Sequence, residues 1–110
     1  MISRMALGDY LMPGEEVRFR SSQRVRYGNK RYQVLLTDRR ILLFARRGAL
    51  FKSDDVVSQK LGDLQGVKYR EHGIIEKKGT IQVHSLKTEM DLSGPAQEVK
   101  ALYQQMMQFM

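Results

Sequence analysis

Cysteine and tryptophan are absent from this chain of 110 residues, and proline occurs only twice. Without cysteine there is no disulfide framework, no thiolate nucleophile and no cysteine-ligated metal. Long apolar runs are also missing, because the longest, Ile41 to Ala45, is far shorter than the ~18–20 residues of a membrane-spanning helix. No charged-then-apolar leader opens the sequence, since Gly8 and Asp9 interrupt the segment after Arg4. We therefore expect a soluble, cytoplasmic protein, with peripheral attachment to a membrane as an alternative.

The length allows one domain with one hydrophobic core, since domains usually comprise about 100–150 residues. Apolar residues make up 42% of the chain, too large a share for a disordered protein. Glycines separate apolar segments of roughly 5–12 residues, a spacing typical of short strands joined by turns. We expect a single domain over residues 1–110, with a lead-in over 1–15, strands over about 16–92 and a helix over about 95–109.

Positive charge is concentrated in one third of the chain. The sequence has 19 Lys and Arg residues against 12 Asp and Glu residues, a formal net charge of +7. Eleven of these basic residues lie within residues 18–52, where Asp38 is the single acidic residue. A field of that density attracts an anionic partner, such as a lipid headgroup, a nucleic acid or an acidic protein. The alternative is a charged surface that keeps the domain soluble and prevents sheet edges from pairing.

Strands are predicted where apolar segments end in turn residues, at about 16–27, 31–36, 40–45, 56–61, 67–71, 80–85 and 87–92. The third of these is apolar on both faces, so we expect it to lie centrally. Successive side chains point to opposite faces, which divides the first strand into two sets. The basic set comprises Arg18, Arg20, Arg24 and Arg26. The set expected to face the core comprises Val17, Phe19, Val25 and Tyr27. Small polar residues at 21–23 predict a bend or bulge that re-aims one pair of arginines relative to the other.

A helix is predicted at the C-terminal end, where the apolar period changes. Pro95 suits the first helical turn because its missing N–H would have no partner there, and Glu98 lies near the positive end of the helix dipole. Apolar side chains form one stripe at helical spacing, comprising Val99, Leu102, Tyr103, Met106, Phe109 and Met110. One helix cannot bury such a stripe alone, so we expect it to cover the open end or face of the sheet.

The order of about seven strands followed by an amphipathic helix resembles the outline of the pleckstrin-homology (PH) fold. Two segments strengthen the resemblance, LMPGEEV at residues 11–17 and YQVLLTDRRILL at residues 32–43. They are similar to the PGE and LTxxRI signature of prokaryotic PH-like domains, which are related to the GRAM group. The resemblance implies a mainly β barrel or sandwich of antiparallel strands capped by one C-terminal helix. It also implies that Thr37, Asp38 and Arg39 are structural, because the hydroxyl and carboxylate can accept hydrogen bonds from turn N–H groups.

The same resemblance implies a binding module. PH-like domains bind phosphoinositide headgroups in some eukaryotic proteins and peptides or proteins in many others, and several prokaryotic kinds self-associate. Lipid-binding PH domains carry basic residues on their first two strands, as this chain does. Its arginines nevertheless depart from the lysine-to-arginine spacing of headgroup binders, so the resemblance does not predict a phosphoinositide pocket.

Residues that would indicate catalysis or a bound metal are scarce. His72 and His84 have no second ligand at metal-binding spacing, and both are expected on the surface. The sequence contains no glycine-rich phosphate loop, no nucleophile elbow and no carboxylate pair with an evident partner. We therefore expect no catalytic residues, no metal and no cofactor.

Three functions are compatible with these features. The first is a non-catalytic PH-like binding module that docks on an anionic lipid surface or an acidic protein through a basic strand face. Guanidinium groups bind phosphate and carboxylate in a bidentate manner, so its candidate residues are Arg18, Arg20, Arg24, Arg26, Lys30 and Arg31. The second is an adaptor or assembly domain that binds another protein or itself through Leu50, Phe51, Met107 and Met110. Nucleic-acid binding ranks third, because Tyr27 and Tyr32 share parity with core residues and would turn their rings away from bases.

Overall fold

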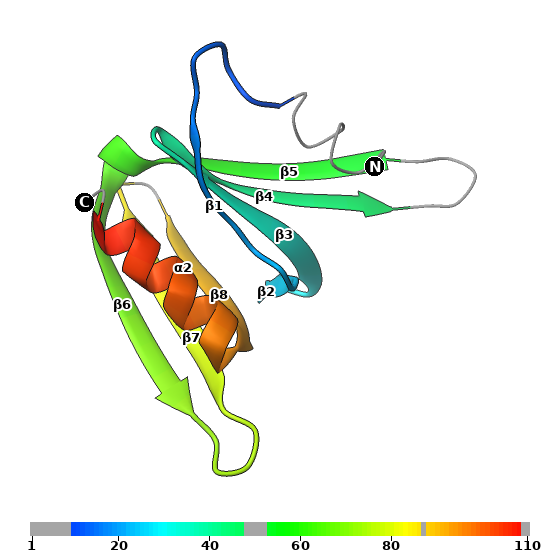
Figure 1. Cartoon of the computed structure of the whole chain (residues 1–110), viewed down its shortest axis with the longest axis vertical. Coiled ribbons are helices and arrows are strands. Elements are labelled where there is room, and N and C mark those ends of the chain that lie inside the picture. The colour runs from blue at the N-terminus through cyan, green and yellow to red at the C-terminus, as the bar shows by residue number, and fades with distance from the viewer. Residues whose placement is uncertain (1–9, 48–52, 87, 109–110) are drawn as a thin grey trace.

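The computed structural model describes residues 10–47, 53–86 and 88–108. Within these ranges the chain forms eight β-strands, one short 3-10 helix and one α-helix (Figure 1). The strands are β1 (Val17–Arg20), β2 (Val25–Tyr27), β3 (Lys30–Thr37), β4 (Arg40–Arg47), β5 (Ser53–Lys60), β6 (Leu64–His72), β7 (Lys78–Ser85) and β8 (Glu89–Pro95). The helices are η1 (Leu61–Asp63) and α2 (Ala96–Gln108). The predicted class, mainly β with one C-terminal helix, is confirmed.

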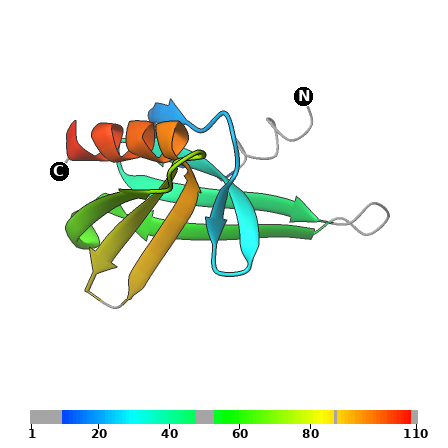
Figure 2. The ribbon, with the colours of Figure 1, turned by 90° about the horizontal axis from the view of Figure 1, so that it is seen from below.

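All described strand pairs are antiparallel, in the order β5-β4-β3-β2-β8-β7-β6, with β1 added on β3. The sheet has a first half, made of β1, β3, β4 and β5, and a second half, made of β2, β6, β7 and β8. Figure 2 shows α2 along one side of the strands, with the β2–β3 and β7–β8 turns on the side away from it. The pairing of β2 with β3 joins the second half to the first, and β2 also pairs with β8 within the second half.

The first predicted strand is two strands in the structure, β1 and β2. The predicted bend between them is confirmed, and it is anchored by the buried Ser21. The Ser21 hydroxyl accepts a hydrogen bond from the Val34 N–H at 2.9 Å, and the Ser21 N–H donates to the Val34 carbonyl oxygen at 2.9 Å. Both strands pair with β3, so the bend carries the chain from one half of the sheet to the other. The prediction that Val17 faces the core is wrong, because a register shift between Val17 and Phe19 leaves Val17 38% exposed.

The other strands and the helix correspond to the predicted ones and differ at their ends. Strands β5 and β6 begin three residues earlier than predicted, and β8 ends three residues later. These ends carry polar residues and glycine, such as Gln65 and Gly94, and ladder hydrogen bonds rather than an apolar pattern hold them. The apolar pattern therefore locates each strand and underestimates its length.

The main hydrophobic core lies between the two halves of the sheet and α2. The helix buries one side, which comprises Ala96, Val99, Leu102 and Met106. These side chains pack with buried strand residues such as Ile81 and Leu92, so the described part of the apolar stripe covers the sheet as expected. The close approach of α2 to β7 depends on Gly79. An added Cβ there would lie 2.9 Å from the Tyr69 ring and 3.2 Å from the Val99 Cβ atom.

A smaller apolar cluster covers the opposite face of β3 and β4. Its buried members are Leu35, Leu42 and Phe44. Leu11 from the N-terminal segment and Val56 from β5 pack against it, and the Tyr10 ring lies 5.9 Å from the ring of Phe44. Strand β4 is therefore covered on both faces, as its apolar sequence predicts.

A buried ion pair holds the N-terminal segment on this face. The fully buried Glu15 carboxylate accepts hydrogen bonds from the Arg40 guanidinium at 2.9 and 3.0 Å. It also accepts them from the Met12 N–H at 2.9 Å and the Thr37 hydroxyl at 2.5 Å. The hydrogen bond from Arg40 is the largest effect and outweighs burial, so the pKa of Glu15 falls from 4.5 to about 2.

The two sequence motifs meet at this ion pair and act structurally, as the resemblance implies. Besides its bond to Glu15, the Thr37 Oγ1 atom accepts hydrogen bonds from the Arg39 N–H at 3.1 Å and the Arg40 N–H at 3.0 Å. The Asp38 carboxylate accepts one from the Glu16 N–H at 2.9 Å. The β3–β4 turn and the lead-in to β1 are thereby fixed to each other, which sets the direction in which β1 enters the sheet.

Candidate functional site

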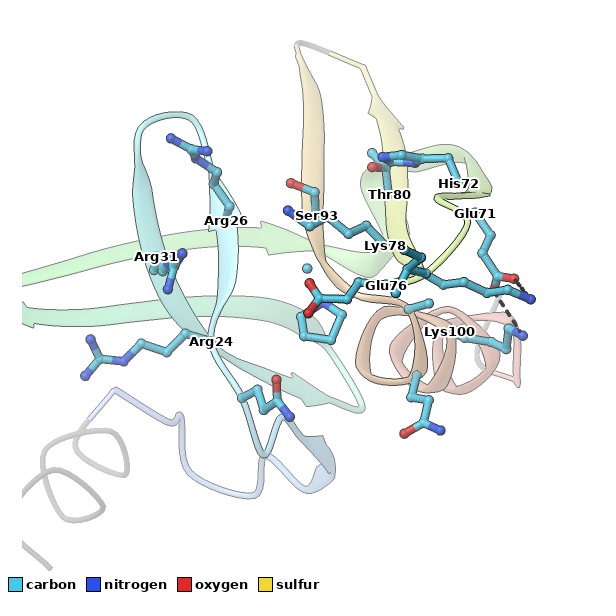
Figure 3. Close-up of a pocket in the computed structure, with 17 residues that line it drawn as sticks. Arg24, Arg26, Arg31, Glu71, His72, Glu76, Lys78, Thr80, Ser93 and Lys100 are labelled. Carbon is cyan, nitrogen blue, oxygen red and sulfur yellow. Dashed lines mark ion pairs between the residues drawn. The ribbon is translucent and has the colours of Figure 1, made fainter.

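An open, basic hollow of about 1280 Å³ lies where β2 meets β8, close to the start of α2 (Figure 3). Figure 3 shows Arg24, Arg26 and Arg31 on the side of the β2–β3 hairpin. The opposite side, on β7 and β8, includes Lys78, Thr80 and Ser93. The lining contains six Lys or Arg residues against two Glu residues, a formal surplus of four positive charges.

Arg26 and Arg31 lie directly opposite each other on β2 and β3. The neighbouring pair, Val25 and Tyr32, is buried in the core, so alternation puts both guanidinium groups on the outer face. Like charges placed opposite each other destabilise a sheet. Among the described residues, no carboxylate forms an ion pair with either arginine. The hairpin therefore presents two adjacent cations that repel each other, and no carboxylate among the described residues offsets this repulsion.

Hydroxyl groups continue this row across the second half of the sheet. Arg26 is the register partner of Ser93, and Ser93 is the register partner of Thr80. Lys78 lies two residues before Thr80 on β7 and so shares its face. Guanidinium, ammonium and hydroxyl groups are all hydrogen-bond donors, and the guanidinium fork matches phosphate and carboxylate geometry. The row therefore suits an anionic ligand with several oxygen atoms.

The Glu71 carboxylate in the hollow is compensated from three sides. It lies 3.1 Å from the Lys100 ammonium and 3.7 Å from that of Lys77, and it accepts a hydrogen bond from the Tyr69 hydroxyl at 2.9 Å. The Tyr69 bond and then the Lys100 bond hold the pKa of Glu71 below its usual range. Burial, followed by the bond to Glu71, raises the pKa of Tyr69 to about 12. The lining cations that have no carboxylate partner among the described residues are Arg24, Arg26, Arg31 and Lys78.

The structure brings together three of the six predicted anion-binding residues. Those that line the hollow are Arg24, Arg26 and Arg31. Arg18 and Arg20 lie on β1, before the bend at Ser21, and Arg18 forms an ion pair with Glu16 at 3.6 Å. Lys30 is engaged by Asp55, with 2.9 Å between its ammonium and the Asp55 Oδ2 atom. The bend at Ser21 therefore separates arginines that share parity in the sequence.

The residues proposed for protein contact are mostly outside the described ranges, which exclude Leu50, Phe51 and Met110. Met107 lies on the outer side of α2 and is 40% exposed. The tyrosines considered for base stacking face inward, as expected. Tyr32 is buried, and its ring centroid lies 6.0 Å from that of the partly buried Tyr27.

Sequence reasoning missed Lys78, Thr80 and Ser93 as site residues. Lys78 falls in the Lys77-Lys78-Gly79 run, which resembles a turn, and Ser93 resembles a helix cap. Alternation along β7 could have identified Lys78, because it lies two residues before Thr80 and four before Gln82, on the same outer face. The proximity of Ser93 to Arg26 carried none, since it depends on a strand pair far apart in the sequence.

Neither a metal cluster nor a membrane-spanning helix is present in the part of the chain that the structure describes. No three His, Cys, Asp or Glu side chains gather there in a way that could hold a metal ion. No helix within the described ranges has the length and apolar character needed to traverse a bilayer.

The arrangement of strands and helix matches known PH-like structures. No family model and no curated protein matches the sequence. A pleckstrin homology domain from Shewanella amazonensis SB2B is similar over 98% of this chain and 95% of its own, with a TM-score of 0.68 and 13% identity. A DUF1696 family protein with a pleckstrin-homology domain from Shewanella loihica PV-4 is similar over 98% and 90%, with a TM-score of 0.66 and 13% identity. The C-terminal domain of an unknown protein from Leishmania infantum has a TM-score of 0.62 and 15% identity over 98% and 94%. The chain therefore has a PH-like fold, while kinship with the GRAM group stays a prediction.

Proposed function

We propose that this chain is a non-catalytic PH-like binding module that captures an anionic partner in the basic hollow between the β2–β3 hairpin and β7–β8. The observation that supports it most strongly is the cross-strand pair of Arg26 and Arg31, which has no carboxylate partner among the described residues. The hollow also gathers two further cations without a carboxylate partner among the described residues, Arg24 and Lys78.

The energetics of the arginine pair favour a ligand. A cross-strand pair changes stability by about 0.2–1 kcal/mol, and the sign is unfavourable for like charges. A phosphate or carboxylate between the two guanidinium groups replaces that repulsion by charge-assisted hydrogen bonds, each worth about 1.5–3 kcal/mol. The hydroxyls of Thr80 and Ser93 and the ammonium of Lys78 supply further donors within the same hollow. Binding should therefore weaken as salt screens the charges.

A pair of matched double variants tests the proposal. R26T/R31T removes two charges inside the hollow, and R18T/R20T removes the same number on β1 outside it. Two anionic probes are offered at low and moderate salt: vesicles of phosphatidylglycerol and phosphatidylcholine, and a fluorescent polyglutamate peptide. We expect R26T/R31T to lose at least about tenfold in affinity for the probe that binds, since two charged hydrogen bonds are removed. Equal losses in both variants would mean that only net charge matters and that the hollow is not the site.

A further inference from the structure

The loop between β6 and β7 presents two apolar side chains to solvent. Ile74 is 98% exposed and Ile75 is 95% exposed. The loop projects beyond the neighbouring strands at the bottom of Figure 1. It begins at Gly73, whose φ is +109°, and an added Cβ atom there would collide with the Glu76 carbonyl oxygen. The backbone therefore makes a tight loop that holds both isoleucines at its tip.

Basic side chains surround the base of this tip. Lys77 and Lys78 follow the tip after Glu76, and Arg70 lies on the outer face of β6 as the register partner of Thr80. Ile75 also lines the basic hollow, together with Lys78 and Arg26. The acidic groups nearby are Glu71, which is compensated by two lysines, and Glu76 within the loop itself. The apolar tip and the cationic hollow are therefore adjacent parts of one surface.

We propose that this surface docks on an anionic lipid bilayer, with Ile74 and Ile75 inserted among the headgroups and the arginines of the hollow against lipid phosphates. The inference rests on the proposed function and names its partner as a membrane. Apolar insertion and electrostatic attraction to anionic lipids add to each other in holding a protein at a bilayer surface. The order of the residues fits this arrangement, because the exposed isoleucines are at the tip of the loop and Lys77 and Lys78 lie nearer to its base.

The shape of the tip favours a membrane over a protein partner. Stable protein interfaces usually bury at least about 1,200 Å² in total and have a broad apolar centre. Two side chains at the end of one loop do not provide such a centre. The headgroup region of a bilayer accommodates a narrow apolar tip, because lipids rearrange around it.

Another exposed apolar residue lies at the other end of β7 and provides a rival docking point. Leu86, in the β7–β8 turn, is 69% exposed. Eight residues of β7 separate it from the Ile74–Ile75 loop, which at 3.3 Å per residue is about 26 Å. In Figure 2 the β2–β3 turn lies on the same side of the strands as the β7–β8 turn. A probe at each end therefore distinguishes two orientations on a membrane.

Single tryptophans report which end enters the lipid, because the natural chain contains none. I75W and L86W are each mixed with vesicles of phosphatidylglycerol and phosphatidylcholine, and with vesicles of phosphatidylcholine alone. We expect the I75W emission to shift to the blue and to be quenched by brominated lipid with anionic vesicles, while the L86W emission stays unchanged. A shift confined to L86W would overturn the inference and assign docking to the opposite end.

The second variant, I74S, separates the tip from the hollow, because Ile74 is not one of the residues that line the hollow. We expect its affinity for anionic vesicles to fall about tenfold at moderate salt, equivalent to about 1.4 kcal/mol. Its affinity for inorganic tripolyphosphate, a soluble anion, should equal that of the parent. Unchanged vesicle binding in I74S would overturn the insertion and leave the hollow as an electrostatic site. Binding of polyglutamate or tripolyphosphate without vesicle binding would replace the membrane by a soluble anionic partner. Absence of binding to all three probes would reject the proposed function as well.

Discussion

The two halves of the sheet share an apolar inner face and differ on the outer face. In the first half, the outer face of β3 and β4 carries the smaller apolar cluster, which lies beneath Leu11 and the Tyr10 ring. In the second half, the outward residues are polar or charged. They include Lys68, Arg70, Lys78, Thr80 and Gln82 on β6 and β7, and Glu89 and Asp91 on β8. The described N-terminal segment, residues 10–16, packs on the outer face of the first half, where the Glu15 ion pair holds it. The difference between the two outer faces therefore follows from where this segment packs.

The largest expected loss of stability comes from a substitution in the outer apolar cluster of the first half. L42A removes a fully buried side chain from the outer cluster and should lower the free energy of unfolding by about 3 kcal/mol, because it leaves a cavity. The matched substitution on the outer face of the second half, Q82A, should change the free energy of unfolding by less than about 0.5 kcal/mol. Urea unfolding followed by circular dichroism measures both. Similar losses would show that the second face is also covered in solution.

The next effect removes the ion pair that holds the N-terminal segment. The folded pKa of Glu15, about 2, lies below the ordinary value of 4.5. Its stabilisation is therefore fully present above pH 4.5 and is lost as the pH falls toward 2. E15Q should cost about 2 kcal/mol at neutral pH, since it leaves Arg40 without its buried partner. It should also lose less stability than the parent between pH 4.5 and pH 2.

The neighbouring variant E16Q is the control, because Glu16 is exposed and its ion pair with Arg18 lies at the surface. We expect a change below about 0.5 kcal/mol and a parental acid profile. Unfolding midpoints measured from pH 7 to pH 2 test both statements. Parallel profiles for E15Q and the parent would contradict the assignment of the pKa shift.

A smaller effect concerns the contact of α2 with the second half. G79A places a methyl group 2.9 Å from the Tyr69 ring and 3.2 Å from the Val99 Cβ atom, so we expect a loss of about 1–2 kcal/mol by overpacking. G66A on the adjacent strand β6 meets no atom within 4 Å and should be neutral or slightly stabilising. Thermal unfolding measures the midpoints of both variants. Equal midpoints would contradict the close packing of α2 against β7.

The smallest effect has the opposite sign. R26T/R31T should raise the free energy of unfolding by about 0.5 kcal/mol, because it relieves repulsion between opposed cations. R18T/R20T should give no such gain, since it removes the ion pair of Arg18 with Glu16. The difference should disappear in 1 M salt, where the Debye length is about 3 Å. A loss of stability in R26T/R31T would mean that the arginines support the fold rather than a ligand.

The sequence predicts the strands and the helix well because both depend on local periodicity. Alternation also predicts that Arg24, Arg26 and Arg31 lie on an outer face, and the structure places all three at the hollow. Arg18 and Arg20 are exposed as parity predicts, but they do not reach the hollow, because the bend at the buried Ser21 turns the chain into the other half of the sheet. The other wall of the hollow depends on the register between β2 and β8. No local pattern encodes a register between strands so far apart in the chain.

The junction of β2 with β8 also bears on the order in which the domain folds. Most other strand pairs of the domain are hairpins of consecutive strands, which close short loops and should therefore form early. The junction of Arg26 with Ser93 closes most of the chain into one ring and should form late. The hollow exists only after this closure. A ligand that bridges Arg26 and Lys78 would bind only the closed domain, so its concentration alone would shift the unfolding midpoint upward.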